Sequence, residues 1–125
     1  MNAEISSFAD AGDIEKERLV IRILKDLDIG DYVVLCSSLF DGDHVTSGPK
    51  KAYWFPDGDV KSGDLVILYT KRGNSATKPL EGGRTAYFYY WRQERPLWDG
   101  EHAAVLLEVA NWVKRVVPEA PKDDR

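Results

Sequence analysis

Two loops of the sequence carry side chains that could bind a metal ion. Each holds one histidine and two acidic residues: Asp41, Asp43 and His44 in the first, and Asp99, Glu101 and His102 in the second. Imidazole and carboxylate groups are ligands of zinc and iron, so the two loops could form a site if the fold joined them. However, no His-x-x-x-His or Cys-x-x-Cys spacing is present, and acidic residues beside glycine ordinarily form turns. We therefore expect no metal and no cofactor, and keep a small metal-dependent enzyme as an alternative.

The nucleophilic side chains lack a catalytic context. The chain has no Gly-x-Ser-x-Gly sequence, which marks the exposed serine of many hydrolases. Its single cysteine, Cys36, ends an apolar run and has Asp31, Asp41 and Asp43 nearby, whereas a reactive thiolate needs a basic, partly exposed setting. The sequence therefore predicts no catalytic residues, a protein that is not an enzyme, and a Cys36 side chain buried as a small hydrophobe.

The most informative segment is the aromatic run Tyr87-Phe-Tyr-Tyr-Trp. In a β-strand, Tyr87, Tyr89 and Trp91 would share one face, and Phe88 and Tyr90 the other. Only one face of a strand in a two-layer sandwich points into the core, so the other presents large rings to solvent or a partner, unless a loop or the N-terminal segment covers them. Aromatic and arginine side chains are enriched at binding hot spots. The predicted contact surface combines this strand with its flanking loops: Lys71, Arg72, Arg84, Tyr87, Tyr89, Trp91, Arg92, Arg95 and Trp98.

The charge distribution bears on the kind of partner. The chain has 17 basic and 21 acidic side chains, a net charge of −4, which opposes strong non-specific binding to nucleic acid. The segment from Lys71 to Arg95, however, contains six basic residues and only two acidic ones. We expect a protein partner or a homo-oligomer, and binding of single-stranded nucleic acid through bases and rings is the first alternative. No apolar run approaches the roughly 20 residues that cross a bilayer, so no membrane association is expected.

The elements that position these residues are short strands separated by turn signals. Strands are expected near residues 19–25, 31–38, 52–55, 65–70, 85–92, 102–109 and 111–117, with long polar loops at 40–51 and 71–84. Helical patterns long enough for a parallel βαβ unit are missing. The sequence therefore predicts an all-β domain with an antiparallel sandwich or barrel.

Two segments resemble a known family. Tyr53-Trp-Phe-Pro-Asp-Gly-Asp-Val-Lys-Ser-Gly-Asp-Leu-Val-Ile-Leu-Tyr-Thr has the aromatic-Phe-Pro step, Lys-Ser-Gly-Asp corner and apolar strand of the lamin tail domain, and Pro96-Leu-Trp-Asp-Gly-Glu-His resembles its Trp-bearing segment. The resemblance covers roughly residues 18–117. It implies an immunoglobulin-like antiparallel β-sandwich of six to nine strands that has no catalytic residues and serves as an interaction module.

The two ends of the chain are expected to lie outside this sandwich. Residues 1–17 carry five acidic residues against Lys16 and predict a polar N-terminal arm, and residues 118–125 predict a charged C-terminal tail. The first residues contain neither the basic nor the apolar region of a secretory signal, so we expect a cytoplasmic protein.

Overall fold

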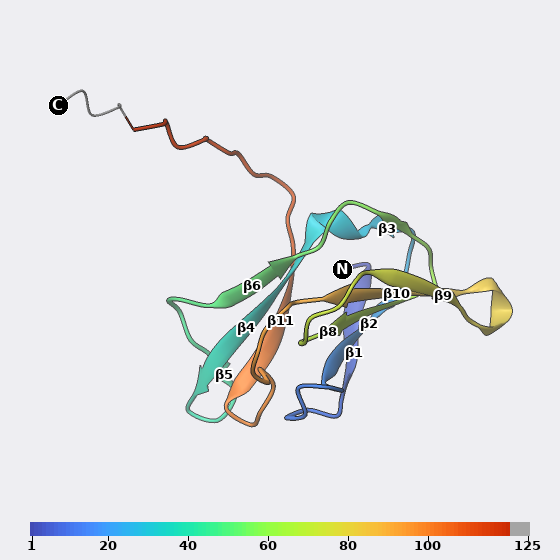
Figure 1. Cartoon of the computed structure of the whole chain (residues 1–125), viewed down its shortest axis with the longest axis horizontal. Helices are drawn as coiled ribbons and strands as arrows, with labels where there is room; N and C mark the ends of the chain where they lie inside the picture. The colour runs from blue at the N-terminus through green and yellow to red at the C-terminus, as the bar shows by residue number, and fades with distance from the viewer. Residues whose placement is uncertain (121–125) are drawn as a thin grey trace.

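A computed structural model describes residues 1–120 as two packed β-sheets with no α-helix in that range (Figure 1). The first sheet contains, in spatial order, β1 (Ala3–Ala9), β2 (Arg18–Ile23), β8 (Leu65–Tyr69), β10 (Thr85–Tyr90) and β9 (Ala76–Pro79). The second contains β11 (His102–Glu108), the central β4 (Tyr32–Phe40), and on the far side of β4 both β6 (Lys51–Trp54) and β5 (His44–Val45). A small ribbon, β3 (Leu27–Asp28) with β7 (Asp59–Val60), and the 3₁₀ turns η1 (Ile29–Asp31) and η2 (Glu81–Gly83) complete the domain. The prediction of an all-β sandwich is confirmed.

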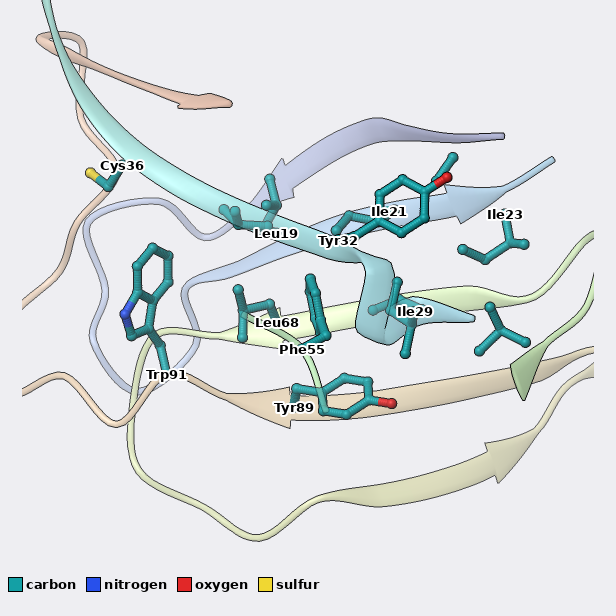
Figure 2. Close-up of a cluster of buried hydrophobic side chains, with 14 of the residues drawn as sticks. Leu19, Ile21, Ile23, Ile29, Tyr32, Cys36, Phe55, Leu68, Tyr89 and Trp91 are labelled. Atoms are coloured by element: carbon teal, nitrogen blue, oxygen red, sulfur yellow. The ribbon is translucent and has the colours of Figure 1, made fainter. Parts of the chain in front are cut away.

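The core lies between the two sheets because alternate side chains of each strand point inward. On β2 these are Leu19, Ile21 and Ile23, and on β4 they are Tyr32 and Val34; all are at most 1% exposed. Figure 2 shows this cluster, with the rings of Phe55, Tyr89 and Trp91 between the strands. Complete burial of one such side chain contributes about 1.5–3 kcal/mol to stability.

The N-terminal segment differs from the predicted arm. Residues 3–9 form β1, an edge strand paired with β2. The β1 residues Ala3 and Ile5 pack toward the core. The register shifts between Ile5 and Ser7, so the inward alternation is interrupted and then resumes at Phe8. This bulge conceals the strand in the sequence, because the apolar residues no longer recur with a period of two. Only the stretch between β1 and β2 is a polar loop.

The C-terminal segment also differs from the prediction, because it lacks a strand that was expected. The prediction of a closing strand at residues 111–117 is wrong: β11 ends at Glu108, and residues 109–120 leave the sandwich without joining either sheet (Figure 1). Among the described residues β11 pairs with β4 alone, and after Glu108 the chain does not turn back along the outer edge of β11, where a closing strand would pair. Of the predicted charged tail, residues 121–125 lie outside the described range.

The loop predicted at residues 71–84 contains a strand that changes the sheet topology. β9 pairs with the outer edge of β10, and β10 returns beside β8 in the parallel direction. The other strand pairs of the described chain are antiparallel, as predicted. This crossover places both chain segments that follow β8 and β10 at the same end of the sandwich.

A buried carboxylate, Glu17, holds that end together. Its side chain has 0% exposure and accepts hydrogen bonds at both oxygens. Oε1 accepts from the backbone N–H groups of Gly12 (2.8 Å) and Trp98 (3.2 Å). Oε2 accepts from the Leu97 N–H (2.9 Å) and from the Thr70 hydroxyl. A buried charge is tolerated when it is satisfied in this way, and it then connects segments that are far apart in the chain.

We expect Glu17→Gln to destabilise the fold, because the amide places a donor group against N–H and O–H donors. Each hydrogen bond to a charged group contributes about 1.5–3 kcal/mol, and the free energy of unfolding should fall by on the order of 3 kcal/mol. Urea denaturation measures this change. The control is Glu15→Gln, whose side chain is 77% exposed, and equal stability of the two variants would contradict the assigned role.

Candidate functional site

An open cleft of about 900 Å³ lies at the Glu17 end of the sandwich. Three segments line it: residues 49–51 at the start of β6, Arg72 after β8, and residues 92–99 after β10. Cys36 and Ser38 of β4 and His102 of β11 complete the lining. The crossover described above brings the second and third segments together. We call this feature the basic cleft.

The basic cleft reverses the charge of the molecule. Its lining contains five basic and two acidic side chains, apart from His102: Lys50, Lys51, Arg72, Arg92 and Arg95 against Glu94 and Asp99. The lining thus has a net charge of +3, from five minus two, on a chain whose net charge is −4. A concave surface of one sign concentrates the electrostatic field and attracts groups of the opposite sign.

Two of the five bases are free to act on a ligand. The Lys50 ammonium donates to Ser37 Oγ (2.8 Å), and Lys51 Nζ donates to Gln93 Oε1 (3.3 Å). Arg72 pairs with Glu94 at 3.3 Å. Arg92 and Arg95 are exposed, and neither forms an ion pair with another residue in 1–120.

The backbone of Arg92 is strained. Its φ is +62°, in the left-handed region that a side chain with a Cβ rarely adopts and that costs roughly 1 kcal/mol or more. Hydrogen bonds on both sides enforce it: the N–H groups of Arg92 and Gln93 donate to the carbonyls of Lys71 (3.1 Å) and Thr70 (2.8 Å). The strain turns the Arg92 side chain out of the strand and into the cleft lining.

The loop after Arg95 is held in place by buried residues. Its residues Leu97 and Trp98 are buried and donate their N–H groups to Glu17. The Trp98 ring packs against Trp91 and Phe8, with centroid distances of 6.0 and 5.3 Å. Arg95 therefore extends from a segment that is fixed immediately after it.

The cleft contains one thiol, that of Cys36, and it is not set up as a nucleophile. Burial raises the pKa of Cys36 above its ordinary value, and the negative charges of Asp99 and Glu17 raise it further, against a smaller opposing effect of Lys51. The thiol also donates a hydrogen bond to the Leu97 carbonyl oxygen, at 3.7 Å. At neutral pH the group is the neutral thiol, which is a poor nucleophile.

The structure brings together part of the predicted contact surface. Arg72, Arg92 and Arg95 line the basic cleft. Lys71 lies instead over the Tyr69 ring, at 5.4 Å, on the outer face of the first sheet. Arg84 is exposed beside η2, where its Nε donates to the Glu81 carbonyl, and it does not line the cleft.

The aromatic members of the predicted surface require a correction. Tyr89 and Trp91 are 8% exposed and Trp98 is 3% exposed, and Tyr87 packs partly buried against the same core. The physical reason is the strand face: β10 directs Tyr87 and Tyr89 between the sheets. The opposite face carries Phe88 and Tyr90, and there Tyr90 stacks on Tyr69 at 5.3 Å.

Sequence reasoning missed Lys50 and Lys51. They belong to the loop at 40–51, which was expected only to connect strands. The signal that could have identified them is the Pro-Lys-Lys run directly before a predicted strand, since a basic pair at a strand end lies at the rim of a sandwich.

The two histidines occupy different strands. His44 is on β5 and His102 on β11, and β4 runs between these strands. His102 Nδ1 lies 2.7 Å from Asp99 Oδ1, and this contact is the main reason why the pKa of Asp99 is lowered. His44 packs against the Phe40 ring at 5.5 Å. Residues 1–120 contain no group of three or more His, Cys, Asp or Glu side chains placed to hold a metal ion.

No protein-family model matches the chain, and no curated protein matches it. None of residues 1–120 forms a helix with the length and apolar character needed to traverse a bilayer. The class defined by the fold and the site is thus a β-sandwich with a basic cleft at one end.

We expect Cys36 to react slowly with a disulfide reagent at neutral pH in the native protein and fast in denaturant. The raised pKa leaves less thiolate at any given pH, so the native rate should increase only at more alkaline pH than the rate of the unfolded chain. Cys36 is the single cysteine, so the released chromophore reports on it alone. Equal rates in both states would contradict a buried, neutral thiol.

Proposed function

We propose that this protein is a non-catalytic interaction module whose basic cleft binds an acidic segment of a protein partner. The observation that carries the proposal is the reversal of charge: five bases converge from three segments in a molecule that is otherwise acidic. A carboxylate-rich segment would bind to the unpaired guanidinium groups of Arg92 and Arg95. Each of these groups can donate two parallel hydrogen bonds to one carboxylate.

The shape of the cleft supports a chain segment as the ligand rather than a small apolar molecule. Cavities for small ligands are mostly apolar and enclose most of the ligand surface. The basic cleft is open, and charged side chains dominate its rim. An extended peptide can lie along such a surface and exchange its carboxylates among several bases.

The resemblance to the lamin tail domain supports the same proposal, because that family serves as an interaction module. The cytoplasmic location expected from the sequence stays a prediction.

Binding of single-stranded nucleic acid is the first alternative function, since phosphates would also be attracted to the basic cleft. Such proteins combine positive charge with exposed rings on which bases stack. Here Tyr89, Trp91 and Trp98 are buried, so the rings that would stack are not offered to a ligand. The charge of the cleft attracts both kinds of ligand, and the burial of the rings supports the acidic peptide.

We expect the double variant Arg92→Glu, Arg95→Glu to bind an oligoglutamate peptide at least about tenfold more weakly than the wild type at low salt. The control is Lys25→Glu, an exposed base outside the cleft lining. Fluorescence anisotropy of the labelled peptide measures the affinity, and added salt should weaken binding to the wild type. A labelled thymidine oligonucleotide provides the comparison; tighter binding of the oligonucleotide would favour the alternative function, and equal losses in both variants would contradict a role for the cleft.

Arg92→Gly separates binding from stability. Glycine accepts a φ of +62° without strain, so the free energy of unfolding should stay within roughly 1 kcal/mol of the wild type or increase. Peptide binding should nevertheless fall, because one of the two unpaired guanidinium groups is lost. Thermal unfolding and the same anisotropy titration give both values, and unchanged binding would remove Arg92 from the site.

A further inference from the structure

The outer face of the second sheet is apolar across all three of its long strands. On β4, the side chains of Tyr32, Val34 and Cys36 point into the core. Val33 and Leu35 alternate with them and therefore lie on the outer face. The strand register aligns further apolar side chains with these two in rows across the sheet. The outer apolar face consists of Val33, Leu35, Ala52, Trp54, Ala103, Val105 and Leu107.

This face is not part of the core, and it has a polar border where Ala103 pairs with Ser37, whose hydroxyl oxygen accepts from the Lys50 ammonium at 2.8 Å. Trp54 is 47% exposed and Leu107 is 40% exposed, and none of the seven belongs to the buried cluster between the sheets. Monomeric proteins seldom leave a contiguous apolar surface of more than a few hundred Å² in water, and a larger one marks an interaction site.

The C-terminal segment adjoins the same face. The Val109 N–H donates to the Asp31 carbonyl (2.7 Å) at the end of β4, and the Trp112 ring then packs edge-on against Trp54, with a centroid distance of 5.0 Å. Beyond Trp112 the segment extends away from the sandwich (Figure 1), with Val113, Val116 and Val117 at least 78% exposed. Its composition is that of a strand, yet it has no partner strand in the described chain.

We propose that the outer apolar face and residues 109–117 form the interface of a homodimer, in which a second copy of this chain packs its own face and segment against them. The unpaired elements support a second copy as the occupant: residues 109–117 have the composition of a strand without a partner strand, and β11 pairs with β4 alone in the described chain, so each copy offers what the other lacks. Two sheet faces can pack about 10 Å apart in an aligned arrangement, as the two layers of a sandwich do.

The required area supports the participation of the segment. The flat extent of β4, β11 and β6, which have nine, seven and four residues, is roughly 330 Å², below the roughly 800 Å² per partner of a stable interface. The extended segment with its four exposed apolar side chains supplies the remaining contact. A two-fold axis lets each segment cover the partner, so that both copies make the same contacts. The Trp54–Trp112 pair lies where the face and the segment meet, and aromatic anchors of this kind dominate interface energies.

The dimer is tested by sedimentation equilibrium of the full chain. We expect the wild type at twice the 14.1 kDa of the monomer, and Leu107→Lys to shift the mass to that of the monomer at the same concentration. The matched control is Leu24→Lys, because Leu24 is 42% exposed against 40% for Leu107 but lies outside the face; it should stay a dimer.

A second variant guards against loss of folding. Val113 is 96% exposed, so Val113→Lys leaves the packing of the sandwich unchanged. We expect it to weaken the dimer at least about fivefold, with an unaltered thermal transition at a protein concentration at which both proteins are monomers. A wild type that is monomeric at high protein concentration would overturn the proposal. So would a dimer that persists undiminished in both Leu107→Lys and Val113→Lys.

Discussion

The burial of the Glu17 carboxylate is the constraint on which the end of the sandwich that carries the cleft depends. Four donors from three separate parts of the chain converge on its two oxygens: the loop after β1, the end of β8 and the loop after β10. A charged acceptor in a low-dielectric setting makes each of these hydrogen bonds strong, and its removal would leave several donors buried without partners. The negative charge also lies below a surface that is otherwise positive.

The geometry of the cleft follows from this anchoring. The loop after β10 is fixed at Leu97 and Trp98 by Glu17, and at Arg92 and Gln93 by the backbone that follows β8. Between these two points, Arg95 is held in position without being paired. Arg92 occupies a strained left-handed conformation that its neighbours impose. Strain of this kind persists only where the surrounding structure over-determines it, and it is common where a side chain must be aimed at a ligand.

The sequence predicted the parts of the fold that depend on local pattern and missed those that depend on distant partners. Leu19, Ile21 and Ile23 alternate, and the strand that contains them was identified. β1 was missed because its bulge interrupts the alternation, and Glu17 was counted among the acids of a solvated arm because its partners lie up to 81 residues away. The segment 111–117 has the composition of a strand but pairs with no strand of the described chain; propensity reports what a segment can form and not what it can pair with. Three of the bases in the cleft were predicted from charge clustering, whereas Lys50 and Lys51 join them only through the packing of the β5–β6 loop.

The fate of the aromatic residues argues for an electrostatic mode of recognition. The inner rings form a continuous series of contacts through the core: Tyr89 with Phe55 (5.2 Å), Phe55 with Tyr53 (5.0 Å), Tyr53 with Trp91 (6.0 Å) and Trp91 with Trp98 (6.0 Å). Burial raises the pKa values of Tyr53 and Tyr89, and the positive charge of Arg92 opposes this effect at Tyr53. The rings thus belong to the core instead of forming a surface on which a ligand stacks. Under the two proposals, a ligand in the basic cleft meets charge and a second copy of the chain meets the outer apolar face, so the two kinds of recognition would use separate surfaces of one small domain.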